Sequence, residues 1–260
     1  MSTPPPPDPS PAAADRRPLL PRIAFGLALL AALLVLLAGP GSRGGVWDFR
    51  TGFALLKWGA YLGIAAALAC VAALFLARRA RGLAIAGLVM ALAAVGIPWS
   101  FMRSAQGVPP IHDITTDTGN PPPFVAVLPL RAEAPNPAAY EGEAIAAQQR
   151  AAYPDIRPLM LTLPPPAAFD EALAAARGMG WEMVAADRNQ GRIEATDRTF
   201  WFGFKDDVVI RVMPASGITR VDVRSVSRVG KSDVGANARR VREYLAKLRE
   251  RVPQAVAEVS

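Results

Sequence analysis

Cysteine and histidine are almost missing from this sequence, which holds one of each, Cys70 and His112. A single cysteine excludes a disulfide within the chain and a cysteine-rich zinc site. A single histidine excludes a metal site built from several histidines and leaves little scope for histidine-based acid–base catalysis. We therefore predict neither a metal nor a cofactor.

Net charge is missing from the larger, C-terminal part of the chain. The 260 residues carry 29 Lys and Arg against 22 Asp and Glu, a net charge of +7. Residues 1–103 hold 10 basic and 3 acidic residues and account for the whole excess, whereas residues 104–260 hold 19 of each. Because the excess lies in the apolar part, it indicates membrane topology and no binding of nucleic acid.

Three long apolar stretches, at about 23–39, 53–77 and 82–102, fill the first hundred residues. Each has 17 to 25 residues, which crosses a hydrocarbon core of roughly 30 Å at about 1.5 Å per residue. None shows the polar stripe of a water-soluble helix. We expect a membrane module of three transmembrane helices at 22–103, preceded by a disordered cytoplasmic tail at 1–21. The first stretch ends without a small-residue cleavage site, which indicates a retained anchor.

The charges and aromatic residues beside these stretches predict their orientation. The short loop 78–81 carries three arginines and no acidic residue, which favours the cytoplasmic side. Trp58 and Trp99 lie near the ends of their helices that are farthest from this loop, where aromatic residues are expected at the other membrane interface. We therefore predict a multi-pass membrane protein with a cytoplasmic N-terminus and with its C-terminal domain on the opposite side of the membrane. The lipid bilayer is its first partner.

Residues 104–137 are rich in proline and are expected to form an extended linker that is neither helix nor strand. This segment contains His112 and Asp113. Neighbours in sequence are poorly placed to form a catalytic dyad, so we expect the pair to pack along the domain or the membrane surface.

Residues 138–260 have the alternating patterns of an α+β domain. Short loops join the strands, which predicts an antiparallel sheet of about five strands with helices packed on one face. The expected helices are 138–152, 166–177 and 235–251, and the expected strands are 158–163, 181–187, 191–199, 207–213 and 218–227.

A loop at 214–217 would set the register of the last hairpin. It places Asp207 opposite Arg224 and predicts an ion pair between them. It also places Arg211 opposite Arg220, an unfavourable contact unless Asp222 lies between the two guanidinium groups.

Residues 224–240, here called the arginine motif, form the densest cluster of special residues. A strand leads into a glycine-containing turn and then into a helix that Ser232 or Asp233 would cap. Residues 225–232 match a phosphate-binding P-loop except that Ser225 replaces its first glycine, and a P-loop belongs to a parallel sheet. Lys231 beside a serine suggests a Ser–Lys nucleophile, but such a lysine must be buried to lose its proton. We therefore predict no catalytic residue.

Two roles without catalysis are left open for the motif. The helix N-terminus and the cations around it are suited to binding an anion. Alternatively, the arginines pair with nearby aspartates and hold the turn. The candidate anion ligands are Arg228, Lys231, Ser232, Asn237 and Arg239. The candidate structural residues are Asp206, Asp207, Arg224, Ser225, Ser227, Gly230, Asp233 and Gly235.

The motif R-S-x-S-R-x-G-x-S-D-x-G-x-N at 224–237, together with residues 205–208, resembles the signature of the DUF1499 family. Residues 111–116, followed by Asn120-Pro121-Pro122, are similar to the segment that leads into the domain in its membrane-anchored members. The resemblance covers about residues 108–250 and implies a domain type and an envelope setting, with no catalytic residues. Together with the predicted orientation, this setting implies a multi-pass protein of the bacterial cytoplasmic (inner) membrane with a periplasmic C-terminal domain. We expect a binding or scaffolding module on the periplasmic side, with an anionic lipid or an envelope protein as partner. The alternative is an enzyme acting on an envelope or lipid substrate.

Overall fold

A computed structural model describes residues 19–253 of this chain, which fall into two compact units divided between Phe101 and Met102. Most of the tail predicted at 1–21 lies outside the described residues. Residues 19–21 already belong to the first helix, so for them the tail prediction was wrong.

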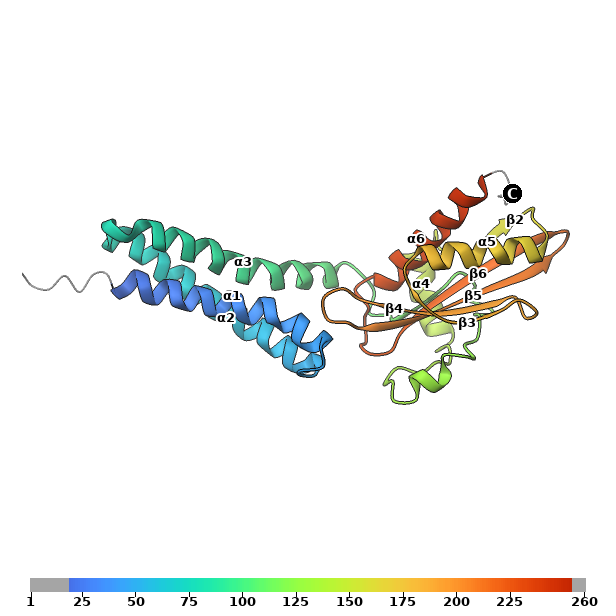
Figure 1. The fold of residues 1–260 in the computed structure, drawn as a ribbon, viewed down its shortest axis with the longest axis horizontal. Helices are drawn as coiled ribbons and strands as arrows, with labels where there is room; N and C mark the ends of the chain where they lie inside the picture. Colours follow the sequence, from blue (N-terminus) through green and yellow to red (C-terminus); the bar gives the residue numbers. More distant parts are fainter. Residues whose placement is uncertain (1–18, 254–260) are drawn as a thin grey trace, which may run out of the picture. The chain divides into compact units, whose positions relative to one another are not determined.

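The first unit consists of α1 (Leu19–Arg43), α2 (Phe49–Leu76), the 3-10 turn η1 (Arg78–Ala80) and most of α3 (Arg81–Gln106) (Figure 1). All three α-helices are long and apolar enough to cross a membrane, which confirms the three-helix prediction. Small residues let them approach closely: a Cβ added at Gly59 would lie 2.7 Å from Val35 Cγ2.

The second unit is built on one antiparallel sheet in the order β1-β6-β5-β4-β3, and β2 pairs with the same edge of β6 as β1 does. This confirms the predicted fold. The strands are β1 (Asp113–Thr115), β2 (Leu159–Leu161), β3 (Glu182–Asp187), β4 (Arg192–Arg198), β5 (Lys205–Ala215) and β6 (Ile218–Ser227).

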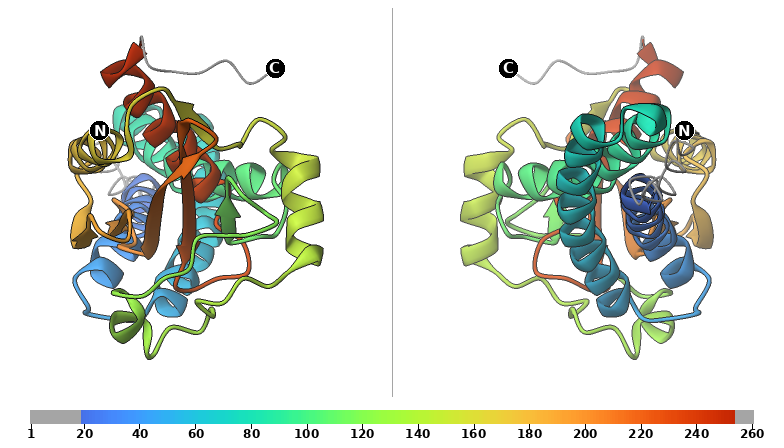
Figure 2. Two further views of the ribbon diagram at one scale, coloured as in Figure 1. Left: turned by 90° about the vertical axis from the view of Figure 1, so that its right-hand side faces the viewer. Right: turned by 90° about the vertical axis from the view of Figure 1, so that its left-hand side faces the viewer.

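Two helices, α5 (Pro165–Gly178) and α6 (Ala236–Arg251), cover one face of the sheet (Figures 1 and 2). Their apolar stripes share one core with the inward residues of the strands, where Trp181 stacks on Tyr244 at 5.6 Å between ring centroids. The remaining helix, α4 (Glu143–Ala152), lies beside β1. There the Gln149 side chain donates to Thr115 O at 2.6 Å and accepts from Thr115 N at 3.0 Å.

The prediction of an extended linker at 104–137 was wrong. Residues 113–115 form the strand β1, and residues 128–131 form the 3-10 turn η2 (Leu128–Arg131). Phe124 and Val127 pack on Val209 and Val226, so this segment covers the face of the sheet that α5 and α6 leave open. A three-residue strand is too short to show alternation, which is why the prolines dominated the prediction.

The helix predicted from residue 138 begins at Glu143, because Gly142 has a φ of +81° and does not continue a helix on its N-terminal side. The register of the last hairpin is also two residues from the predicted one. Ser216 and Gly217 both have positive φ and form a two-residue turn that pairs Ala215 with Ile218. A shift of two keeps every side chain on its predicted face but changes its partner.

Candidate functional site

Arg224, the first residue of the arginine motif, is 2% exposed and forms an ion pair with Asp113 of β1. Its Nε and Nη2 donate to the two carboxylate oxygens of Asp113 at 3.0 and 2.7 Å. The predicted partner, Asp207, lies opposite Val226 instead. The partner of Arg224 thus comes from the segment that was expected to be a linker.

The rest of the Arg224 guanidinium is also enclosed. It donates to the carbonyls of Pro122 at 3.2 Å and Ala138 at 2.9 Å. The rings of Phe124 and Tyr140 lie 5.1 and 5.5 Å from its central carbon, within the range of cation–π attraction. Burial raises the pKa of Tyr140 to about 12, so this ring stays neutral beside the ion pair.

Asp207 on β5 is the centre of a second buried cluster. Arg228 donates to both of its oxygens at 2.8 Å, Thr196 Oγ1 donates at 2.6 Å, and Arg131 Nη1 donates at 2.6 Å. Burial opposes the negative charge, but these hydrogen bonds together hold the pKa of Asp207 below its ordinary value. Of the pairs that were expected in general between the motif arginines and nearby aspartates, the structure contains the one between Arg228 and Asp207.

The helix that follows the motif is tied to β6 by Asn237, which is fully buried. Its Nδ2 donates to His112 O and to Ser227 Oγ, both at 2.9 Å, and its Oδ1 accepts from Ser225 Oγ at 2.7 Å. Arg240 adds an ion pair to Asp206 at 2.6 Å. Side-chain hydrogen bonds therefore fill the space between the strand and the helix.

The N-cap of this helix is Gly235 and not Ser232 or Asp233 as predicted, but Asp233 supports the start of the helix rather than pairing with an arginine. Its carboxylate accepts from Gly235 N at 2.8 Å and from Asn237 N at 2.7 Å. Gly230 and Gly235 have φ of +100° and +77°, the left-handed region that favours glycine. Ser232 Oγ accepts from Val234 N at 3.2 Å within the same turn.

The structure separates the five candidate anion ligands into two groups. Arg228 and Asn237 take part in the internal network just described. Ser232 lies in the turn, and the side chains of Lys231 and Arg239 are exposed. Arg239 Nε lies 3.8 Å from Glu243 Oε1.

A third network lies nearer the other end of β6. Asp222 is fully buried and accepts from Arg211 at 2.8 Å, from Arg220 at 3.0 Å and from Thr116 Oγ1 at 3.2 Å. Asp117 accepts from both arginines, at 3.1 and 2.6 Å. In the observed register Arg211 lies opposite Asp222 and not opposite Arg220, so the predicted contact between the two arginines does not arise and Asp222 bridges their guanidinium groups.

Sequence reasoning missed several members of these networks. Glu194 is fully buried and accepts from the backbone N–H groups of residues 125, 126 and 127 at 2.9 to 3.2 Å. Asp113, Arg131 and Glu194 all fix the 111–138 segment to the sheet. In a sequence, the only sign of a buried charge on a strand is a charged residue within an apolar run. Glu194, in the stretch R-I-E-A-T at 192–196, carries this sign.

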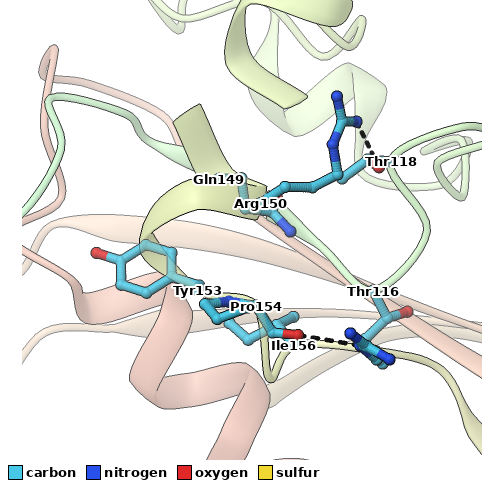
Figure 3. A pocket seen from close by; sticks show the side chains of 8 residues that line it. Thr116, Thr118, Gln149, Arg150, Tyr153, Pro154 and Ile156 are labelled. Atoms are coloured by element: carbon cyan, nitrogen blue, oxygen red, sulfur yellow. Dashed lines mark hydrogen bonds between the residues drawn. The ribbon is translucent and has the colours of Figure 1, made fainter. Parts of the chain in front are cut away.

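A pocket of about 320 Å³ opens where β1 and β2 separate along the edge of β6. Arg150 and Arg157 are the basic residues of the lining, Arg150 also forms an ion pair with Glu143, and the apolar wall includes Tyr153 and Ile156. Arg150 Nη1 donates to Thr118 Oγ1 at 3.1 Å (Figure 3). The lining residues are Thr116, Thr118, Gln149, Arg150, Tyr153, Pro154, Ile156 and Arg157.

The one histidine lies elsewhere, beside β1. His112 is 9% exposed, its carbonyl accepts from Ser227 N at 3.0 Å, and its Nε2 lies 3.6 Å from Glu141 Oε2. As expected, this segment packs along the domain.

These two units define a membrane protein with three apolar helices followed by an α+β domain on an antiparallel sheet. The domain has a matching family model, described as "Protein of unknown function (DUF1499)", over residues 113–248. The chain belongs to the DUF1499 family. The match begins at Asp113, the residue that pairs with Arg224. No curated protein matches the chain.

Proposed function

We propose that this protein is a binding module displayed on the periplasmic side of a bacterial cytoplasmic membrane. The orientation is supported by the arginines of the short connection between α2 and α3, since cytoplasmic loops carry an excess of Lys and Arg. Its test is a pair of C-terminal fusions in cells. Alkaline phosphatase should be active and green fluorescent protein dark after export by the general secretory route, and the reverse pattern contradicts the orientation.

The pocket at the β6 edge is the observation that carries the binding role. Its volume of about 320 Å³ falls within the range of small-molecule sites, and it joins apolar walls to a few polar groups. A guanidinium has five N–H donors, and Arg157 Nε donates to Pro154 O at 3.0 Å, which uses one of them. Arg150 and Arg157 therefore suit a ligand with a phosphate or carboxylate group.

The same groups favour binding over catalysis. A guanidinium stays protonated at neutral pH, and a threonine hydroxyl donates and accepts hydrogen bonds without ionising. Arg150 and Thr118 can therefore orient an anion, whereas proton transfer needs a group with a pKa near the working pH. The lining of this pocket offers no group with a pKa near the working pH, so it does not support the alternative of an enzyme acting on an envelope or lipid substrate.

Inorganic phosphate is the simplest probe of the pocket. The full chain in lipid nanodiscs should melt at a higher temperature in phosphate than in chloride at equal ionic strength, because a ligand that binds only the folded state stabilises it. Arg157→Ala should remove this rise and leave the melting temperature in chloride nearly unchanged, since the side chain is exposed. Lys231→Ala is the matched control and should keep the rise. A rise that survives Arg157→Ala contradicts the assignment.

A further inference from the structure

One end of the sheet gathers three segments that are far apart in sequence, and we call it the proximal end. Ser227, the last residue of β6, donates from its backbone N to His112 O at 3.0 Å. Arg228 N donates to the carbonyl of Lys205, the first residue of β5, also at 3.0 Å. The segment at 111–112, the β4–β5 loop at 199–204 and the turn at 228–235 therefore lie together. The turns at 188–191 and 216–217 lie at the opposite end.

The proximal end is also where the chain arrives from the membrane helices. α3 ends at Gln106, and Ile111 is already fully buried in the domain core. Four residues separate them, and five Cα–Cα steps reach at most about 18 Å. Ile111 therefore cannot lie farther than that from the last residue of a helix able to cross the membrane.

The β4–β5 loop at this end has an unusual composition for an exposed loop. Residues 199–204 read T-F-W-F-G-F, with four aromatic residues in six positions. Phe200 is 91% exposed, whereas exposed loop tips usually carry small or polar residues. The other three rings, of Trp201, Phe202 and Phe204, are half-buried. An aromatic cluster that leaves one ring almost fully exposed marks a contact site with protein or lipid.

The loop is rigid enough to present these rings. Thr199 N donates to Phe204 O at 2.9 Å, and Phe204 N donates to Thr199 Oγ1 at 2.8 Å, which closes its base. Phe202 stacks on Phe204 at 5.4 Å between ring centroids and meets Trp201 edge-on at 5.6 Å.

Positive charge surrounds the aromatic cluster. Arg198 and Lys205 flank the loop, both exposed, and no acidic residue lies between them. Lys231 is exposed in the neighbouring turn. Aromatic rings combined with Lys and Arg are the composition that prefers the boundary between lipid headgroups and acyl chains.

We propose that the proximal end docks on the bilayer that holds α1, α2 and α3, with the 199–204 loop at the headgroup boundary. The short connection from α3 supplies the proximity, the aromatic rings supply apolar area, and Arg198, Lys205 and Lys231 attract anionic headgroups. The domain then keeps one orientation on the membrane surface. This proposal depends neither on the ligand of the pocket nor on the side of the membrane that carries the domain.

The test uses the full chain in nanodiscs of phosphatidylcholine and phosphatidylglycerol with brominated acyl chains, which quench tryptophan on contact. The chain has five tryptophans, and Trp181 is buried in the domain core. If Trp201 touches lipid, Trp201→Phe removes a quenched fluorophore and the quenched fraction of the total emission falls. Trp181→Phe is the control: it removes an unquenched fluorophore, so the fraction rises.

A second variant tests docking without removing the reporter. Phe200→Ser changes a side chain that is 91% exposed and outside the hydrophobic core of the domain, so the core should stay folded. The substitution should lower the ratio of docked to free domain by about tenfold or more. Quenching of Trp201 should fall with it. If Trp201→Phe raises the quenched fraction as Trp181→Phe does, or if Phe200→Ser leaves quenching unchanged, the loop does not dock on lipid and the proposal is wrong.

Discussion

Replacing Arg224 by alanine is the sharpest perturbation of the buried network. The substitution leaves the Asp113 carboxylate without its ion-pair partner and leaves the carbonyls of Pro122 and Ala138 without a donor. Removing one partner of a buried pair costs about 3–5 kcal/mol, because the remaining charge stays desolvated. With a urea slope of about 2 kcal/mol/M for a domain of this size, the unfolding midpoint should fall by about 1.5–2.5 M.

The assay is hydrogen exchange followed by mass spectrometry on the full chain in nanodiscs at increasing urea, read on peptides from β5 and β6. Arg239→Ala is the matched control. This exposed side chain lies 3.8 Å from Glu243 in an i,i+4 pair, so the loss should be about 0.5 kcal/mol or less.

A double variant separates lost charge pairing from general disruption. Arg224→Met with Asp113→Leu removes both charges, and it should recover part of the stability that Arg224→Ala loses. An Arg224→Ala protein with the midpoint of the unmodified chain would refute the reasoning, because a buried carboxylate that loses its ion-pair partner should lower the stability measurably.

Two further predictions concern the same domain. The pKa of Asp207 is lower in the folded state than its unfolded value of about 3.9, so its contribution to stability is complete above that pH and disappears as the pH falls through the folded pKa. The free energy of unfolding of Asp207→Asn should therefore lie below that of the unmodified chain at pH 7, and the two values should converge in acid. A difference that stays constant with pH would contradict this. A fragment of residues 102–260 should be soluble and melt cooperatively in a thermal scan. A fragment that begins at Thr118 should not, because it lacks β1 and the Asp113 partner of Arg224. Equal melting temperatures of the two fragments would show that β1 adds nothing to the stability of the domain.

The sequence predicted the elements whose pattern is local. Three apolar helices and the strands from residue 181 onward each carry their own periodicity, so their existence followed from composition and alternation. The segment at 111–138 could not be predicted in this way. Its structure depends on distant partners, since Asp113 pairs with Arg224 and residues 125–127 donate to Glu194.

The arginine motif shows the same division. The turn glycines and a hydrogen-bonding role for Asp233 at the start of the helix could be inferred from residue types alone, although the N-cap itself is Gly235. The partner of Arg224 could not, because the hairpin register is shifted by two residues and the carboxylate comes from Asp113 of β1, far away in the sequence. The pocket was also missed, since it forms where two short strands part along β6, and neither strand end has a sequence signal.

The central claim is that the domain binds an anionic ligand at the pocket while the arginine motif holds the fold. The most direct measurement is photo-crosslinking in intact cells, with a benzophenone amino acid at Thr118 on the pocket and, as control, at Asn189 in the turn at the opposite end of β4 from the aromatic loop. Mass spectrometry should find an adduct with a phosphate- or carboxylate-containing molecule at 118, lost in Arg157→Ala and not formed at 189. An adduct at 118 that persists in Arg157→Ala, or the same adduct at both positions, would contradict the account.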